Sequence, residues 1–132
     1  MPINGATIMD GATCSVTGGT AKTYTPNGAR VSNGIQVADA SVADLRIQPT
    51  VTVKNNPARI LPDNSWSNAK REAVLTRPKL VTSGLTKFPN IRISATLHPE
   101  MTQAEINELR YQAAQLLFDP DFANFWLAGS TA

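Results

Sequence analysis

The C-terminal stretch 98–129 constrains the fold most, because no earlier segment of the chain shows a sustained helical period. Thr102 followed three residues later by Glu105 forms a capping box, whose hydroxyl and carboxylate satisfy backbone donors in the first helical turn. Asp119-Pro120 ends this helix and begins another, since Asp is a good N-cap and Pro loses no hydrogen bond at the first helical position. With Gly129 as a natural terminator, the stretch predicts two C-terminal helices separated by a tight break.

The first of these helices has more apolar surface than a single packing contact needs. A stripe about 100° wide is expected against a core, yet a second apolar arc lies beside the first and only the remaining side is polar. The first arc is Ile106, Leu109, Ala113, Leu116 and Leu117, the second is Tyr111, Ala114 and Phe118, and the polar back is Glu105, Glu108, Gln112 and Gln115.

The surplus apolar surface packs either on the short helix of the same chain or on another subunit. An aromatic cluster at i, i+3, i+4 spacing in the second helix adds to the surplus and favours another subunit, in an obligate homodimer. The predicted dimer interface is Ile106, Leu109, Tyr111, Ala114, Leu117, Phe118, Phe122, Phe125 and Trp126.

A chain of 132 residues is one domain by size, with a β-rich region at 1–98 and a helical region at 99–129. No charged-then-apolar signal and no run of 18 apolar residues is present, so we expect neither secretion by a signal peptide nor a membrane partner. Cys14 is the only cysteine, which excludes an intrachain disulfide, and we expect it to be a small buried or half-buried residue. No Cys/His cluster predicts a metal site, and no cofactor is expected.

The net charge of +2 conceals a division along the chain. Residues 1–99 hold 11 Lys and Arg against 5 Asp and Glu, whereas residues 100–132 hold one Arg against 5 acidic residues. A basic region separate from an acidic one favours a polyanion bound on one side only.

Residues 1–40 are rich in Gly, Thr, Ala and Asn, which is typical of short strands joined by turns. We expect a hairpin in which 22–25 pairs back across the Gly18-Gly19 turn. The predicted strands of this region are 6–9, 13–16, 22–25 and 35–38.

Stronger strand patterns follow. In 91–97, apolar residues from Ile91 to Leu97 alternate with polar ones and predict a sheet with one apolar face. A second alternation starts at Leu45 and continues through Val53, with Pro49 marking a bulge or an edge. A third strand is predicted at 70–81, and 60–68 is predicted to be a loop anchored by Trp66. The fold class is therefore α+β: an antiparallel sheet with N-terminal hairpins, then two helices that pack on one sheet face.

The other face of this sheet is rich in hydroxyls, amides and cations, which bind phosphates and the base edges of unstacked nucleotides. The alternative is a plain water-facing sheet surface, where Thr and Arg are also common. The predicted RNA-binding residues on this face are Arg46, Gln48, Thr50, Thr52, Lys54, Lys70, Thr76, Arg92, Ser94 and Thr96.

Catalytic patterns are nearly absent. His98 is the only histidine, so any Ser-His-Asp or Cys-His arrangement would have to use it. Nothing in the chain is similar to a nucleophile elbow or a phosphate-binding Gly-rich loop. We therefore expect no catalytic residues and no enzymatic activity.

The order of these elements resembles the coat proteins of the small positive-strand RNA bacteriophages, the leviviruses. Stretches that match in kind are TYTPNGARVSNGIQVADAS, PTVTVKNNP, AVLTRPKLV and MTQAEINELRYQAAQLLFDPDF. The resemblance implies an intertwined homodimer with one continuous sheet, the helices of each subunit crossing onto its partner. It also implies an icosahedral shell around single-stranded genomic RNA, assembled in the host bacterial cytoplasm, with the sheet inside and able to bind an RNA hairpin that represses translation.

The resemblance adds Asn56 to the predicted RNA contacts, since PTVTVKNN matches the family strand whose alternate residues contact the hairpin. On the next strand Glu72 and Val74 depart from the polar or basic residues expected at contact positions, which argues against a specific hairpin operator. The connector 81–90 is short beside the long loop that surrounds the family's symmetry axes. The rival interpretation from another class is a small oligomeric cellular nucleic-acid-binding or adaptor domain of α+β type.

Overall fold

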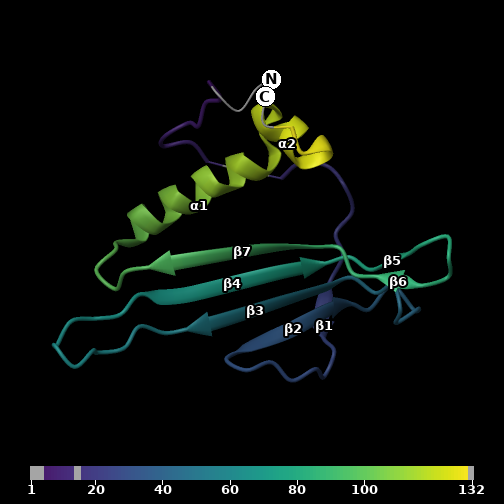
Figure 1. Cartoon of the computed structure of the whole chain (residues 1–132), viewed down its shortest axis with the longest axis horizontal. Helices are drawn as coiled ribbons and strands as arrows, with labels where there is room; N and C mark the ends of the chain where they lie inside the picture. Colours follow the sequence, from purple (N-terminus) through teal and green to yellow (C-terminus); the bar gives the residue numbers. More distant parts are fainter. Residues whose placement is uncertain (1–4, 14–15, 131–132) are drawn as a thin grey trace. The chain divides into compact units, whose positions relative to one another are not determined.

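In the computed structural model, an antiparallel sheet precedes the helices along the chain (Figure 1). The model describes residues 5–13 and 16–130. The chain divides into two units: residues 19–99 contain all of the named strands, and residues 1–18 with 100–132 contain the helices. The antiparallel sheet and the two C-terminal helices confirm the predicted α+β class.

The main sheet has the strand order β1-β2-β3-β4-β7, with every neighbouring pair antiparallel. Its strands are β1 (Tyr24–Pro26), β2 (Gly34–Asp39), β3 (Thr50–Asn56), β4 (Ala69–Thr76) and β7 (Asn90–Leu97). A separate two-stranded ribbon, β5 (Lys79–Leu80) with β6 (Thr86–Lys87), lies in the connection between β4 and β7.

The predicted strand at 70–81 is too long. β4 ends at Thr76, and the chain turns at Arg77-Pro78 before β5 begins. Pro78 has no N–H to donate to a ladder, so the strand cannot continue through it in the middle of a sheet. The connector 81–90 is short, yet it contains β6, the second strand of an ordered hairpin.

The predicted extension of β3 back to Leu45 is wrong as well. Residues 44–47 form a turn in which the Ile47 N–H donates to the Asp44 carbonyl at 3.1 Å. Regular pairing in β3 begins only at Thr50, directly after Pro49, which accepts a hydrogen bond from the Asp39 N–H at 3.0 Å.

The N-terminal strands are the least accurate part of the prediction. Residues 6–9 form no strand, and the chain at Tyr24–Pro26 pairs with β2 instead of with an earlier segment. The predicted strand at 13–16 and the expected burial of Cys14 include residues 14–15, which lie outside the described residues.

Both helical ends are built as the capping residues predict. α1 (Gln103–Phe118) begins after Thr102, whose Oγ1 accepts from the Glu105 N–H at 3.2 Å. Asp119 accepts from the Asp121 N–H at 2.9 Å and starts a 3-10 turn, η1 (Pro120–Phe122), before α2 (Ala123–Ala128). The Gly129 φ of 70° closes α2 in the left-handed conformation, which costs glycine no clash with a β-carbon.

Gln112 and Gln115 on the polar back of α1 hold the N-terminal segment, whereas Glu105 and Glu108 are exposed. Gln115 is only 6% exposed, and its amide accepts from the Met9 N–H at 2.7 Å and donates to the Met9 carbonyl at 2.9 Å. Gln112 donates to Asp10, and Asp121 accepts from the Thr7 N–H at 3.1 Å. These bonds satisfy a strand-like backbone without any partner strand.

One chain alone buries very little apolar surface. Among the described residues, Ala38 and Leu97 are the only buried hydrophobic side chains. Large apolar residues of the sheet, the loops and the helices remain between 38% and 98% exposed. Since hydrophobic burial is the main favourable term in folding, this exposed apolar surface is a candidate for contacts with other chains.

Asp39 gives the fold a dependence on acid pH. Ser41 donates to Asp39 Oδ1 from its hydroxyl at 2.6 Å and from its N–H at 3.0 Å. These hydrogen bonds outweigh burial and lower the pKa of Asp39 from its ordinary value of 3.8. Because the pKa of Asp39 is lower in the folded chain than in the unfolded chain, Asp39 stabilises the fold at pH values above its unfolded pKa. This stabilisation is lost as the pH falls through the folded pKa. We therefore expect the thermal unfolding midpoint to drop below about pH 4, with a smaller acid dependence in Asp39→Asn; an unchanged dependence would contradict this role.

Candidate nucleic-acid interface

The strand register gathers the predicted RNA contacts on one face of the sheet. Lys54 lies opposite Glu72, which lies opposite Ser94, and Asn56, Lys70 and Thr96 form the next row. Directly opposed residues of antiparallel strands point to the same face. This polar face consists of Thr50, Thr52, Lys54, Asn56, Lys70, Glu72, Val74, Thr76, Arg92, Ser94 and Thr96.

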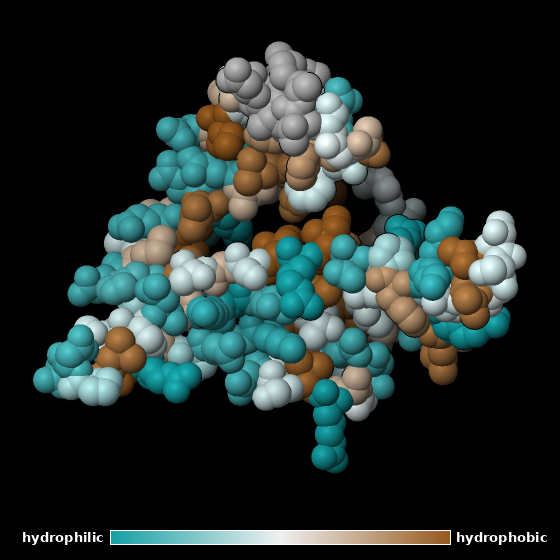
Figure 2. Space-filling model, viewed as in Figure 1, coloured by the Kyte–Doolittle hydropathy of each residue, from teal (hydrophilic) through white to brown (hydrophobic). Residues whose placement is uncertain are grey.

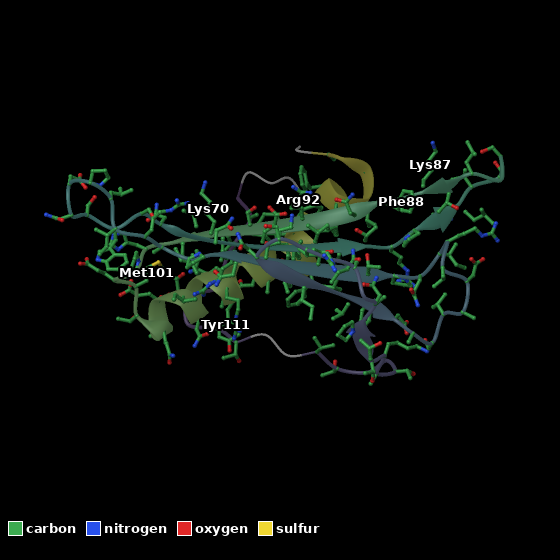
Figure 3. All side chains as sticks on the ribbon, turned by 90° about the horizontal axis from the view of Figure 1, so that it is seen from below. Lys70, Lys87, Phe88, Arg92, Met101 and Tyr111 are labelled. Atoms are coloured by element: carbon green, nitrogen blue, oxygen red, sulfur yellow. The ribbon has the colours of Figure 1, made fainter. Side chains whose placement is uncertain are left out.

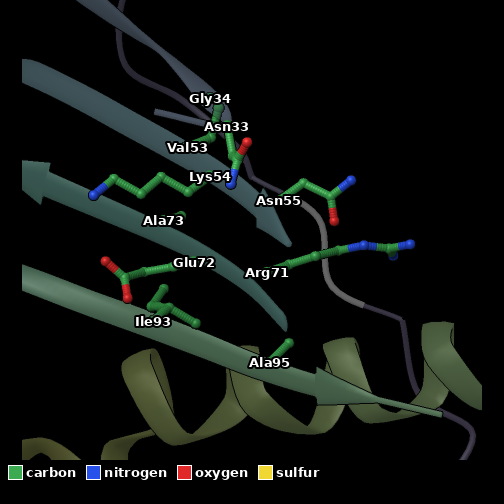
Figure 4. A pocket seen from close by; sticks show the side chains of 10 residues that line it. All are labelled: Asn33, Gly34, Val53, Lys54, Asn55, Arg71, Glu72, Ala73, Ile93 and Ala95. Atoms are coloured by element: carbon green, nitrogen blue, oxygen red, sulfur yellow. The ribbon is translucent and has the colours of Figure 1, made fainter. Parts of the chain in front are cut away.

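The figures show the alternation directly. In Figure 3 Lys70 and Arg92 are labelled on neighbouring strands of the sheet. In Figure 4 the side chains of Lys54 and Glu72 extend to one side of their strands, whereas Asn55 and Arg71 extend to the other. Nine of the predicted contacts therefore lie on one face of the sheet. Alternate residues of each strand point to the same face, and the strands pair without interruption.

The cations on this face differ in their surroundings. Arg92 Nη1 lies 3.6 Å from Glu72 Oε1, so Glu72 partly neutralises the guanidinium. Lys54 and Lys70 are exposed and border a hollow of about 300 Å³, together with Asn56, Ser94 and Thr96. Two ammonium groups beside hydroxyls and an amide can bind a phosphate and the sugar or base attached to it.

Gln36 extends the polar face onto β2 and was not predicted. Its register partner is Thr52, and its Nε2 donates to Thr52 Oγ1 at 3.1 Å. Asn27 Nδ2 in turn donates to Gln36 Oε1 at 3.1 Å. The alternation of Ile35, Gln36 and Val37 was the signal that could have found it.

Arg46 and Gln48 lie outside the strands that form this face. The Arg46 guanidinium binds Asp44 through Nε–Oδ1 at 3.2 Å and Nη2–Oδ2 at 3.0 Å. These hydrogen bonds lower the pKa of Asp44 and raise the pKa of Arg46, so the pair stays charged and mutually neutralised. Gln48 donates to the Asp39 carbonyl at 3.1 Å. Their placement on the polar face is thus wrong, and their contact with RNA stays a prediction.

The opposite face of the sheet is mostly apolar, and several of its side chains are exposed. It consists mainly of Ile35, Val37, Val51, Val53, Ala69, Ala73, Leu75, Ile91, Ile93, Ala95 and Leu97, with Asn55 and Arg71 as its polar members. Ala73 and Ala95 have small side chains, and a hollow of about 440 Å³ lies there beside Val53, Ile93 and Arg71 (Figure 4). Figure 2 shows brown apolar side chains reaching the surface over the strands. A large apolar side chain from elsewhere fits such a hollow.

The helical residues predicted for the dimer interface are only partly covered within the chain. Phe125 and Trp126 meet edge to face, with ring centroids 5.1 Å apart. Trp126 Nε1 donates to the Leu116 carbonyl at 2.6 Å, which ties α2 to α1. The alternative of packing within the chain therefore holds in part, yet Trp126 remains 47% and Phe118 65% exposed. The interface residues stay a prediction.

Residues 5–13 and 16–130 contain no group of three or more His, Cys, Asp or Glu side chains able to hold a metal ion. Within the same ranges, neither helix has the length and apolar character needed to cross a bilayer.

Solved structures identify the fold. The virus-like particle of bacteriophage GQ-907 contains a chain 34% identical to this one, with a TM-score of 0.93 over 98% of this chain and 99% of that chain. The virus-like particle of bacteriophage AVE019 matches at 18% identity and a TM-score of 0.67 over 96% of this chain and 97% of that chain. The particle of bacteriophage ESE058 matches at 16% identity and a TM-score of 0.61 over 94% and 95%. The last two show the fold alone.

Neither the protein-family models nor the curated proteins searched match the chain. The GQ-907 chain is 34% identical over nearly the full length of both chains, which shows that the two chains belong to one family. This chain therefore belongs to the family that its sequence resembles, the coat proteins of the small positive-strand RNA bacteriophages.

Proposed function

We propose that this coat protein forms an obligate homodimer, assembles into an icosahedral shell and packages single-stranded RNA. Its role is structural. The observation that carries the proposal is the two-sided sheet: one face offers cations, hydroxyls and amides, and the other is mostly apolar, with Ile35, Val53, Leu75, Ile91 and Ile93 each between 42% and 47% exposed. A partner on one side and a polyanion on the other satisfy both faces. The virus-like particle that contains a chain 34% identical to this one supports assembly into a shell.

The polar face is suited to RNA of many sequences. Lys54, Lys70 and Arg92 supply phosphate contacts, which carry affinity but no sequence information. Thr50 and Thr52 supply hydroxyls for base edges, so any preference for one hairpin depends on them. Glu72 faces RNA among these groups and repels phosphate, which favours general packaging over a tight operator. The rival, a small cellular binding domain, would use the same polar face without forming a shell.

Expression of the full chain alone, followed by electron microscopy and an A260/A280 ratio, tests the proposal. Closed particles with the absorbance of nucleic acid are the expected result. A discrete soluble dimer that never forms particles would favour the rival, and particles free of nucleic acid would remove the packaging role.

Replacing both Lys54 and Arg92 with Ala tests the polar face. We expect weaker binding to all RNA sequences and a salt dependence whose slope falls by up to roughly 1.4, the value for two phosphate contacts on single strands. Replacing Thr50 and Thr52 with Val should weaken a preferred hairpin more than bulk RNA. Filter binding on purified dimers over a salt series measures both effects.

Arg110→Ala is the matched control, because it removes a cation from the helical unit. The Arg110 guanidinium lies 5.2 Å from the ring centre of Tyr111 on the same helix. RNA binding should stay unchanged. An equal loss in Arg110→Ala and in the double variant would show that the sheet does not face the RNA.

A further inference from the structure

Three polar side chains form a hydrogen-bonded row across the first three strands of the sheet. Asn27 directly follows β1, Gln36 lies in β2 and Thr52 lies in β3. Gln36 and Thr52 are register partners, and the pairing of Pro26 with Val37 brings Asn27 beside Gln36. Figure 1 shows the three strands as neighbours. The row ends at Thr52, one of the predicted RNA contacts.

A backbone N–H fixes the direction of every hydrogen bond in this row. The Ala29 N–H donates to Asn27 Oδ1 at 3.1 Å. Since a backbone N–H only donates, the Asn27 amide must place its oxygen there and its nitrogen toward Gln36. Asn27 Nδ2 donates to Gln36 Oε1 at 3.1 Å, so the Gln36 nitrogen is the atom left for Thr52. Thr52 Oγ1 accepts from it at 3.1 Å.

The direction of the row determines what the Thr52 hydroxyl offers to a ligand. A hydroxyl has one hydrogen to donate and two lone pairs with which to accept. Gln36 Nε2 occupies one lone pair, so the hydrogen points away from Gln36. Within residues 5–13 and 16–130, no atom accepts this hydrogen. Thr52 therefore presents a hydrogen-bond donor on the polar face.

We propose that Gln36 and Asn27 are positioning residues for RNA binding, and that they hold the Thr52 hydroxyl as a donor to an acceptor atom of an unstacked base. This role rests on the proposed packaging of RNA on the polar face. Carbonyl oxygens and ring nitrogens are the acceptors on base edges that a donor of this kind recognises. A hydroxyl that is already oriented loses little freedom when the base binds.

The surroundings of Thr52 favour a base over a phosphate as its partner. Its register partner on β4 is Val74, which is apolar and half-buried. A phosphate beside Val74 would lose water without gaining a counter-charge, whereas the flat face of a base can pack on an apolar side chain. Lys54 and Arg92 on the same face supply charged donors, which bind phosphate more strongly than a neutral hydroxyl does.

Asn27→Asp reverses the row without changing any group that we assign to RNA. A carboxylate has only acceptor oxygens. One of them still accepts from the Ala29 N–H, and the other must accept from Gln36 Nε2. Gln36 Oε1 then faces Thr52 and accepts its hydrogen, which leaves no donor for RNA. Gln36→Met removes the amide at similar side-chain length and leaves the hydroxyl without a fixed orientation.

Purified dimers of the full chain, titrated with an oligouridine and with an abasic strand of the same length, measure the effect. Both strands carry the same phosphates, so the ratio of the two affinities reports base contacts alone. We expect Asn27→Asp and Gln36→Met to lower this ratio about twofold to tenfold, the loss expected for one neutral hydrogen bond. The salt dependence of Gln36→Met should stay that of wild type, because no phosphate contact is lost. Asn107→Asp adds the same charge on α1 and should leave the ratio unchanged.

A double variant separates positioning from direct contact. If Gln36 acts through Thr52, adding Gln36→Met to Thr52→Val lowers the ratio no further than Thr52→Val alone. Additive losses would show that Gln36 contacts RNA itself and would overturn the positioning role. A merely structural role for Gln36 would weaken binding to both strands alike and leave the ratio unchanged.

Failure of this role is distinguishable from failure of the proposed function. Wild-type ratios in both Asn27→Asp and Gln36→Met, with RNA still bound, would overturn the positioning role alone. Equal losses of Gln36→Met on oligouridine and on the abasic strand would overturn the base contact. A wild-type dimer that binds neither strand would remove RNA from the polar face, and the positioning role with it.

Discussion

Ile93→Lys is expected to abolish the dimer and therefore all particles. Ile93 lies in the middle of the apolar face, opposite Ala73 on β4, and is 46% exposed in a single chain. If a partner covers this face, the substitution forfeits roughly 1.5–3 kcal/mol of burial in each subunit. It also desolvates an ammonium group, with an effective penalty of several kcal/mol. Size-exclusion chromatography with light scattering measures the dimer, and we expect insoluble protein or a poorly folded monomer.

Ser94→Lys is the matched control for that experiment. It adds the same side chain to the next residue of the same strand, but on the polar face opposite Glu72. Dimers and particles should persist, and RNA binding should increase, because one more cation faces the phosphates. If Ile93→Lys and Ser94→Lys assemble equally well, the apolar face is not covered by a partner and the dimer proposed here is wrong.

Ile93 and Ser94 lie on opposite faces of the sheet, and this assignment of side chains to faces is what the sequence predicted best. The alternation of apolar and polar residues along β3 and β7 assigned each side chain to one face of the sheet. Because β4 pairs with both strands, the residues of each face lie side by side. A strand pattern of period two is local information, so it survives without knowledge of the partner strands. The capping residues Thr102 and Asp119 were predictable for the same reason, since a cap binds donors only two or three residues away.

Two errors in the predicted strand boundaries occur at prolines. The apolar phase of Leu45 and Ile47 continues that of Val51, yet Pro49 interrupts the ladder and the earlier residues form a turn. Pro78 likewise ends β4. Both prolines were visible in the sequence, but the pattern of hydrophobic residues alone does not show whether a proline marks a bulge or the end of a strand.

Long-range hydrogen bonds account for what the sequence could not predict. Gln115 lies on the side of α1 that appeared solvated, and its partner Met9 is 106 residues away. Such an amide side chain supplies the hydrogen bonds of the backbone that it holds. That segment therefore needs no alternation of apolar and polar residues, and its sequence shows no periodic pattern. The hairpin within residues 57–68 was missed because Pro62-Asp63-Asn64 favours a loop over 60–68. The cross-strand bridge from Ile60 to Trp66 and the hydrogen bond from the Leu61 N–H to the Ser65 carbonyl show otherwise.

Gly34→Ala is expected to disrupt the sheet between β2 and β3. A β-carbon at Gly34 would collide with the carbonyl oxygen of Val53 and would lie 2.9 Å from the Val53 carbonyl carbon and 3.0 Å from Lys54 Cα. The obstacle is backbone, so no side-chain rotation relieves it and the strands must separate. Overpacking typically costs about 1–3 kcal/mol, and a clash with a paired strand belongs at or above the upper end. That is a large share of the 5–15 kcal/mol that typically stabilises a domain.

Gly84→Ala separates this steric effect from the general cost of losing a glycine. Gly84 has a φ of 85° and no atom within 4 Å of an added β-carbon, so its substitution costs only the roughly 1–2 kcal/mol of the left-handed conformation. Amide hydrogen exchange distinguishes the two variants. Gly34→Ala should lose protection along β2 and β3, where Gly34 pairs with Lys54, while Gly84→Ala should keep it. Equal protection in both variants would mean that β2 can move away from Val53 without cost, and that the polar face does not depend on this close approach.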